Sequence, residues 1–427
     1  MLKRIANRRF KADSLQVVMT PKINNLPAIE SSFVQLGAIG HWSFVVRPVF
    51  EGDCFTLFAN SLDELDRAFE DQLDEGEQYH VIYRISLFLA DISQEDEFIA
   101  VLKEHYGDDC PIFEIIPQAP VTGAAYAIEA WGLSAASSDE ISIKRTSDQL
   151  STVSYSGLDW THVVNCRPAV SDDELVYPKS YSCFEELQKQ FNQLDISFED
   201  VIRIWIYLGD IVGPEGETQR YKELNRARTD FFGDMKFCRK YPLDSSDFDA
   251  YPASTGIGSD GKNVILAGLS IHSNSSNLIA VPLENPQQTS AFNYEKTYSP
   301  QSPKFARALG VEYEDGGVIF ISGTASIIDS ESKFIGKPAR QASCTLDNIA
   351  VLIDRTNCRE HGFDRLGAEL NQLAFLRVYI KRPEDYEEIA EVCRKRCGDG
   401  VPMVFTVTDV CRPELLVEME GIVYTKK

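Results

Sequence analysis

The clearest pattern of apolar and polar positions lies between residues 316 and 424. Apolar residues recur every three or four positions at 346, 349, 352 and 353, which is the spacing of an amphipathic helix. Elsewhere in this stretch, apolar segments short of Gly and Pro predict strands. The chain order is a strand at 316–328, a helix at 340–358, a strand at 373–381, a helix at 382–397, and strands at 401–410 and 415–424. This β-α-β-α-β-β order predicts one sheet with two helices on one face.

Less regular copies of the same order precede this unit. Helix-strand-helix-strand patterns cover residues 182–272 and 61–134. We therefore predict an α/β (α+β) fold of three similar units, at 1–145, 146–295 and 296–427, each of ordinary domain size. Stretches rich in turn-forming residues near 135–150 and 283–304 predict linkers. Chance alternation in an unrelated α/β chain would give a similar pattern.

Composition narrows the choice of partners. The 427 residues include 65 acidic and 42 basic side chains, for a formal net charge of −23. An acidic surface repels phosphate backbones, which disfavours nucleic acid, although the charge can also serve solubility alone. A small anionic ligand would need a local group of arginines. No apolar run of 18 residues occurs, so no membrane span is expected.

Cysteine and histidine spacing does not indicate a metal site. The ten cysteines are scattered, and the closest pair, Cys393 and Cys397, is CxxxC. The six histidines form no HxH or HExxH motif, so neither a metal nor a cofactor is expected. The basic N-terminus, MLKRIANRRFKADS, is not followed by an apolar segment, as a secretory signal would be. Reduced, buried thiols then predict a cytoplasmic protein.

The last unit resembles the RidA/YjgF/UK114 family. The resemblance rests on FISG (320–323), QASCTLDNI (341–349), LAFLRVYI (373–380) and LVEMEGIVY (416–424). Members of that family are homotrimers, so three units in one chain imply a covalent pseudo-trimer and favour a monomer. The arginine needed for the family's enamine/imine deaminase activity is replaced in all three units, by Phe113, Ser254 and Val404. These replacements disfavour a deaminase.

Residues 150–427 also resemble the chorismatase family, which is built on the same fold. The matching stretches are RIWIYLGDI (203–211), GETQRYKELNRARTDFF (216–232), YPASTGIG (251–258), NPQQTSAFNYEKTYSPQSPKFARA (285–308), FISGTASI (320–327) and CRPELLVEMEG (411–421). The resemblance implies cofactor-free removal of the enolpyruvyl group of chorismate as pyruvate. The first 140 residues match only as a repeated unit. This unit keeps AIEAWG, with Glu129 at the matching strand position, but lacks the partner motifs, so a structural role is expected for it.

Glu418 and Glu420 interrupt an otherwise apolar closing strand. Residues two apart on a strand point to the same face, so both carboxylates would lie opposite Val417 and Met419. Two partly desolvated carboxylates raise the pKa of one of them, which can then donate a proton to an enol ether. The resemblance places this acid at Glu418. From the residues alone, the alternative is that this strand face is exposed to solvent and that both glutamates are ordinary surface residues.

Chorismate carries two negative charges and needs cationic anchors. The candidates for substrate binding are Arg203, Tyr207, Arg220, Tyr221, Arg228, Arg377 and Tyr379, with Arg220 ranked first and Arg228 second. In SGTASI, Gly323 would let the substrate approach the backbone, and Ser322 and Thr324 would hydrogen-bond it or a water. A glycine required by a strand-end turn explains the motif equally well.

Cys411 bears on the product. The resemblance links cysteine at this position and glycine at position 323 to the branch that forms 3-hydroxybenzoate. A pocket that excludes water would favour attack by the substrate's own hydroxyl. Three alternatives remain. Cys411 can be a buried, inert thiol. The product can be a dihydroxycyclohexadiene carboxylate or 4-hydroxybenzoate, and the protein can be a metabolite-binding protein without turnover.

Overall fold

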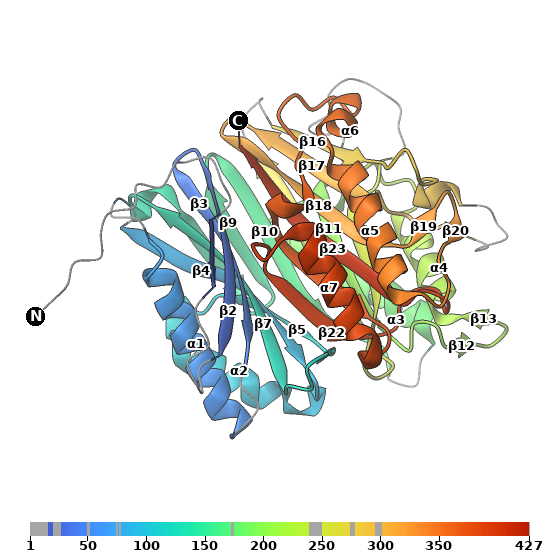
Figure 1. The fold of residues 1–427 in the computed structure, drawn as a ribbon, viewed down its shortest axis with the longest axis horizontal. Helices are drawn as coiled ribbons and strands as arrows, with labels where there is room; N and C mark the ends of the chain where they lie inside the picture. The colour runs from blue at the N-terminus through green and yellow to red at the C-terminus, as the bar shows by residue number, and fades with distance from the viewer. Residues whose placement is uncertain are drawn as a thin grey trace, which may run out of the picture.

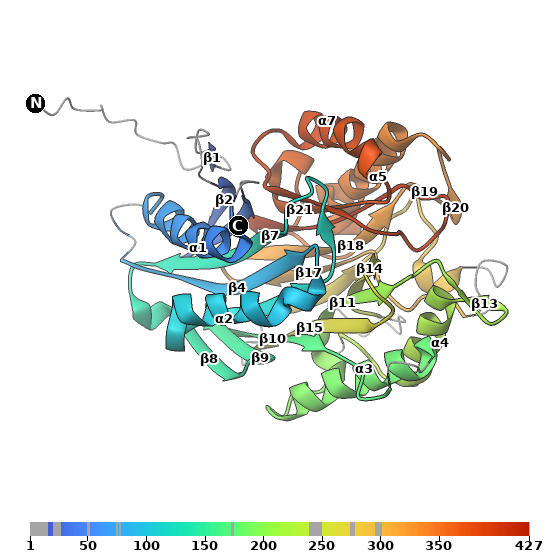
Figure 2. The same ribbon diagram turned by 90° about the horizontal axis from the view of Figure 1, so that it is seen from below.

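Three mixed sheets face one another at the centre of the molecule, and the helices cover their outer sides (Figures 1 and 2). The computed structural model describes residues 16–19, 27–48, 52–73, 76, 78–171, 175–238, 250–273, 278–294 and 301–426. The predicted basic N-terminal arm lies outside these residues. The three-unit α/β fold predicted from the sequence is confirmed. No helix in the described ranges combines the length and the apolarity needed to cross a bilayer.

The first sheet has the strand order β1-β2-β3-β7-β4-β5 and is covered by two helices. Its elements are β1 (Gln16–Met19), β2 (Ala28–Leu36), β3 (Ile39–Arg47), α1 (Cys54–Glu70), β4 (Tyr79–Leu89), α2 (Glu95–Tyr106), β5 (Ile112–Ile116) and β7 (Tyr126–Ala135). Helix α1 begins where the side chain of Asp53 accepts a hydrogen bond from the backbone N–H of Thr56, a regular N-cap. The β2–β3 hairpin was not predicted.

The second sheet has the order β14-β11-β15-β10-β9-β8. Its elements are β8 (Ser142–Ser147), β9 (Leu150–Tyr155), β10 (Leu158–Cys166), α3 (Val176–Asn192), β11 (Val201–Gly209), α4 (Arg220–Phe232), β14 (Ala253–Ser259) and β15 (Val264–Ser273). A small hairpin, β12 (Pro214–Glu215) with β13 (Thr218–Gln219), precedes α4. Strand β8 lies in the stretch that was predicted to be a linker. It was not predicted as a strand because its mostly exposed polar side chains give no apolar signal.

The third sheet has the order β16-β17-β18-β23-β21-β22-β6. Its elements are β6 (Ala119–Pro120), β16 (Ile279–Leu283), β17 (Ala308–Tyr313), β18 (Gly316–Ala325), α5 (Pro338–Ile353), α6 (Arg355–Glu360), β21 (Leu373–Ile380), α7 (Tyr386–Cys397), β22 (Met403–Val407) and β23 (Val417–Lys426). A hairpin of β19 (Ile327–Ile328) and β20 (Glu331–Ser332) follows β18. Strands β6 and β16 join this sheet from earlier in the chain, and the unit boundaries at 145 and 295 stay predictions.

The strands at the centre of each sheet are buried on both faces. In β11, Ile204, Ile206 and Leu208 pack with residues of α3 and α4. The alternate side chains Trp205 and Tyr207 join a central cluster that contains residues of all three sheets. Strand alternation therefore sends one set of side chains to the helices and the other to the interfaces between units. The interfaces are where polar residues of different units meet.

Candidate active site

Glu418 lies on β23 at the interface between the second and third units. Val417 and Met419, its strand neighbours, belong to the apolar cluster formed with α5 and α7. Glu418 points to the opposite face, where it is 4% exposed. Its cross-strand neighbours are Ala325 on β18 and Tyr379 on β21. The alternation predicted from the sequence thus brings this carboxyl between the units.

A break in the pairing of β18 with β23 makes room for the Glu418 side chain. The register shifts between Ile321 and Thr324, and Gly323 lies within the shift. A Cβ atom on Gly323 would lie 2.1 Å from Glu418 Oε1 and 3.1 Å from Thr255 Cγ2. Any side chain at position 323 would therefore displace the carboxyl from its present place.

Ser322 and Thr324 hold this irregular backbone. The Ser322 hydroxyl donates to the carbonyl of Ala306 at 2.6 Å and accepts from the backbone N–H of Ser254 at 2.9 Å. The Thr324 hydroxyl donates to the carbonyl of Ser322 at 2.9 Å. Neither lines the cavity described next. We therefore no longer propose either residue for substrate binding.

A cavity of about 740 Å³, counted with its solvent-filled mouth, opens above Glu418. Its walls come from α4 and β14 of the second unit and from β18, β23 and nearby loops of the third. They include Gln219, Tyr221, Asn225, Ser254, Gly256, Tyr294, Phe305, Arg307, Gly323, Ile327, Cys411, Arg412 and Glu418. Concave sites with a few convergent polar groups at such interfaces are typical of small-molecule binding.

The surroundings of Glu418 keep its carboxyl protonated near neutral pH. Burial, followed by the negative charge of Glu420, raises the pKa of Glu418 to about 8. Arg307 and Arg203 oppose this shift. A protonated carboxyl on the cavity wall can act as a general acid at physiological pH.

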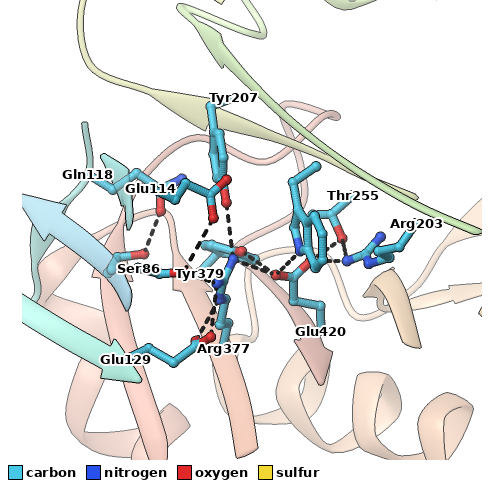
Figure 3. A network of polar contacts seen from close by, with 12 residues as sticks. Ser86, Glu114, Gln118, Glu129, Arg203, Tyr207, Thr255, Arg377, Tyr379 and Glu420 are labelled. Atoms are coloured by element: carbon cyan, nitrogen blue, oxygen red, sulfur yellow. Dashed lines mark hydrogen bonds and ion pairs between the residues drawn. The ribbon is translucent and has the colours of Figure 1, made fainter. Parts of the chain in front are cut away.

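Glu420, in contrast, is held in its ionised form by the cations and hydrogen-bond donors that surround it (Figure 3). Its Oε1 atom accepts from Tyr379 at 2.9 Å, from Arg377 at 3.1 Å and from Trp205 at 3.1 Å. Its Oε2 atom accepts from Arg203 and Thr255. Although burial opposes it, Arg203 and Arg377 hold the pKa of Glu420 below its ordinary value.

Four predicted substrate-binding residues belong to this buried network. Arg203, Arg377 and Tyr379 contact Glu420, and the Tyr207 hydroxyl accepts from Arg377 Nη1 at 3.0 Å. None of the four lines the cavity. Their polar groups bind protein partners, so we no longer propose that they contact the substrate.

The two highest-ranked arginines also lie outside the cavity lining. Arg220 donates to Glu215 at 3.1 Å and to the carbonyls of Gly209 and Lys262, which ties α4 to neighbouring loops. Arg228 is 1% exposed and donates to Asn225 Oδ1 at 2.6 Å. Arg220 thus has a structural place, and Arg228 supports a residue of the cavity wall. Tyr221 does line the cavity, and its contact with the substrate stays a prediction.

The arginine best placed for an anion is Arg307, which was not among the residues predicted from the sequence. Arg307 is 3% exposed, lines the cavity and donates to Tyr294 Oη at 2.5 Å and to the carbonyl of Thr289 at 2.8 Å. Its Nε atom has no hydrogen-bond partner. Within the described part of the chain, no carboxylate lies within 4.0 Å of its guanidinium. Its only sequence signal was its place in the 285–308 segment, just before β17.

Two further polar atoms of the cavity wall belong to residues that were not predicted from the sequence. Asn225 Nδ2 and Ser254 Oγ line the cavity but have no hydrogen-bond partner. A buried polar atom without a hydrogen-bond partner costs stability unless a ligand or a water molecule bonds to it. These atoms therefore favour a polar occupant of the cavity.

Cys411 lies beside the acid. Its Sγ atom is 4.0 Å from Glu418 Oε2, and the side chain is half-buried. Burial and the charge of Glu418 raise the pKa of the Cys411 thiol to about 12. The thiol is therefore protonated at neutral pH and is a poor nucleophile. Across the described residues, no three His, Cys, Asp or Glu side chains are grouped to hold a metal ion.

Comparison with solved structures supports the fold. A crystal structure of a chorismatase matches 80% of this chain and 93% of its own length, with a TM-score of 0.62 and 22% sequence identity. A RutC family protein from Pyrococcus abyssi is 26% identical over 132 residues, covering 30% of this chain and 92% of that protein. No family model matches the sequence.

Two proteins of Streptomyces hygroscopicus are similar in sequence. A 3-hydroxybenzoate synthase is 35% identical over 249 residues, covering 57% of this chain and 68% of the synthase. A chorismatase is 36% identical over 191 residues, covering 44% of this chain and 54% of that relative. A Streptomyces rapamycinicus chorismatase is 30% identical over 232 residues, 53% of this chain and 65% of that protein. The chain therefore belongs to the family of chorismatases and 3-hydroxybenzoate synthases.

Proposed function

We propose that this protein removes the enolpyruvyl group of chorismate as pyruvate and releases the ring as 3-hydroxybenzoate. Glu418 is the proton donor. The observation that carries this proposal is a buried carboxyl, with a pKa of about 8, on the wall of a cavity that also holds a buried arginine. The 3-hydroxybenzoate synthase and the chorismatases that the chain resembles support the choice of substrate.

The reaction begins with proton transfer from Glu418 to the methylene carbon of the enol ether. This step creates an oxocarbenium-like group and leaves a carboxylate that stabilises it. The bond between the ring carbon and the ether oxygen then breaks, and its electrons form the keto group of pyruvate. Glu420 cannot replace Glu418 as the acid, because Arg203 and Arg377 keep it ionised.

Binding of the dianion uses the cavity wall. Arg307 is the proposed anchor for one carboxylate, since its Nε atom lacks a partner. Tyr221, Asn225 and Ser254 supply further hydroxyl and amide groups on the wall formed by the second unit. Contacts from two units fix the substrate relative to the acid, which lowers the entropic part of the barrier.

Product choice depends on which oxygen attacks the ring carbon. Hydroxybenzoate and pyruvic acid together contain the atoms of chorismate, so this route consumes no water. The dihydroxycyclohexadiene carboxylate requires one water molecule. Cys411 occupies the space beside Glu418 Oε2, where it leaves less room for a water, and so favours attack by the neighbouring ring hydroxyl.

Incubation of the purified protein with chorismate tests the proposal. We expect release of pyruvate in step with 3-hydroxybenzoate, both followed by chromatography. Glu418→Gln should lower kcat by about 10²- to 10⁴-fold, the usual contribution of a general acid, while chorismate still binds. Glu391→Gln, on the exposed side of α7, is the control. Binding without turnover by the wild type would instead favour a metabolite-binding protein.

A further inference from the structure

One guanidinium group joins the three units at the centre of the molecule (Figure 3). Arg377 of the third unit donates from Nε to Glu129 Oε2 at 2.7 Å and from Nη2 to Glu129 Oε1 at 3.0 Å. Its Nη1 atom reaches Tyr207 of the second unit and Glu420 of the third. Glu129 and Arg377 are both 0% exposed. Arg377 is thus shared between a carboxylate of the N-terminal unit and the one beside the acid.

The strand registers give Glu129 the place in the first sheet that Glu420 has in the third. A bulge in β4 between Ile82 and Arg84 corresponds to the bulge in β21 between Leu373 and Phe375. Two residues beyond each bulge, Ser86 pairs with Glu129 and Arg377 pairs with Glu420.

The next inward-facing pairs differ. Glu418 pairs with Tyr379, whereas Ala127 pairs with Phe88. The N-terminal unit therefore lacks a counterpart of the acid but has a carboxylate at the place of its partner. That carboxylate, Glu129, forms an ion pair with Arg377 of the third unit.

The charges around Glu418 make this contact important for its protonation. The titratable and charged groups that face it are Glu420 on its own strand, Cys411 and Arg412 in the preceding loop, Tyr294 and Arg307 before β17, Arg203 on β11, and Tyr221 and Lys222 on α4. Arg203 and Arg377 neutralise Glu420 in part. Glu129 in turn neutralises Arg377 and fixes its orientation through two hydrogen bonds.

We propose that Glu129 is a positioning residue for the reaction, acting through Arg377 and Glu420 on the Glu418 carboxyl. This inference rests on the proposed function of Glu418. It gives the N-terminal unit, for which the sequence predicted a structural role, a part in catalysis. Without the Glu129 charge, Arg377 turns fully to Glu420, and the potential at Glu418 becomes more positive. A more positive potential lowers the pKa of a carboxyl.

The test is the pH dependence of kcat/KM in Glu129→Gln. Because Glu418 must be protonated to act, activity falls as pH rises through its pKa. We expect this descending limb to move by about half a pH unit or more to lower pH, as loss of one buried charge would cause. Glu129→Asp keeps the charge but is one methylene shorter, so we expect a lower kcat with the limb in place.

Glu30→Gln is the matched control. Glu30 is also a buried carboxylate of the N-terminal unit that contacts an arginine of the third unit, Arg394, at 3.0 Å. It lies outside the Arg377 network. We expect this variant to lose stability without moving the limb, so a purely structural effect is recognised.

The outcomes are separable. Wild-type turnover with an unmoved limb in Glu129→Gln overturns the inference and leaves the proposed function intact. If Glu129→Gln does not fold, a wild-type kcat in Glu129→Asp overturns it. Failure of the wild type to release pyruvate overturns the proposed function and this inference with it.

Discussion

The Oε1 atom of Glu418 occupies the space that a side chain on Gly323 would need: a Cβ atom there would lie 2.1 Å from it. The two residues lie on adjacent strands of one sheet: Gly323 lies within the break in the pairing of β18 and β23, and Glu418 pairs with Ala325 just beyond it. The absence of a side chain at position 323 therefore sets where the carboxyl points. The glycine of SGTASI therefore affects the position of the acid directly.

Gly323→Ala tests this relationship. The displaced atom is the end of a flexible side chain, so we expect the carboxyl to rotate while the fold remains. A misplaced acid should lower kcat by about tenfold to a hundredfold, as small displacements of reacting groups do. The melting temperature should change by less than about 4 °C, the equivalent of less than 1 kcal/mol.

Gly76→Ala is the control for Gly323→Ala, because a Cβ atom at position 76 would meet no atom within 4 Å. Loss of folding in Gly323→Ala, or an unchanged kcat, would contradict the role assigned to the glycine.

The pH profile of the wild type gives a second prediction. Glu418 donates a proton, so the active form is the protonated one, and the pKa of about 8 places its loss just above neutral pH. We expect kcat/KM to fall about tenfold for each pH unit above about 8. Initial rates of pyruvate release between pH 6 and 10 measure this limb. A rate that rises across this range would indicate that Glu418 acts as a base.

The same shift predicts a pH-dependent stability. The folded-state pKa of Glu418 lies above its ordinary value of 4.5, so between about pH 4.5 and 8 the folded protein binds more protons at this group than the unfolded chain. The free energy of unfolding therefore falls as pH rises through this window. Glu418→Gln removes this contribution. The difference in melting temperature between Glu418→Gln and the wild type should therefore shift in favour of the variant between pH 5 and pH 8.

Cys411→Ala should alter the product more than the rate. The thiol is not a nucleophile at neutral pH, so pyruvate release should stay within about tenfold of the wild type. Removing Sγ opens space beside Glu418 Oε2, and a water there would compete with the ring hydroxyl. In ¹⁸O-labelled water we expect more labelled dihydroxycyclohexadiene carboxylate. Cys393 lies on the buried face of α7, away from the cavity, so Cys393→Ala should leave the product unchanged.

The sequence predicted β11, β21 and the pair of glutamates on β23, because these features depend on local patterns. Apolar runs identified β11 and β21, and the two glutamates of β23 stood out against their apolar neighbours. The edge strand β8 was missed, because an exposed, polar strand carries no such pattern.

The arginines were harder to place. Sequence shows that Arg203, Arg220 and Arg377 are present, but not that Glu420, Glu215 and Glu129 neutralise them. The last of these pairs joins residues 248 positions apart. Arg307 was missed for the converse reason, since nothing near it in the chain shows that its Nε atom lacks a partner.

Arg307 and Arg220 therefore make a contrasting pair of variants. Arg307→Met removes the proposed carboxylate anchor, and loss of a charge-assisted contact of about 1.5–3 kcal/mol should raise KM by about ten- to a hundredfold. Arg220→Met leaves Glu215 without its partner in a nearly buried site. Breaking such a pair costs about 3–5 kcal/mol of stability, so its melting temperature should fall while the KM of the folded enzyme is unchanged. Steady-state kinetics and thermal unfolding of both variants separate the two roles. A raised KM in Arg220→Met with normal stability would return Arg220 to the substrate site and remove the basis for choosing Arg307.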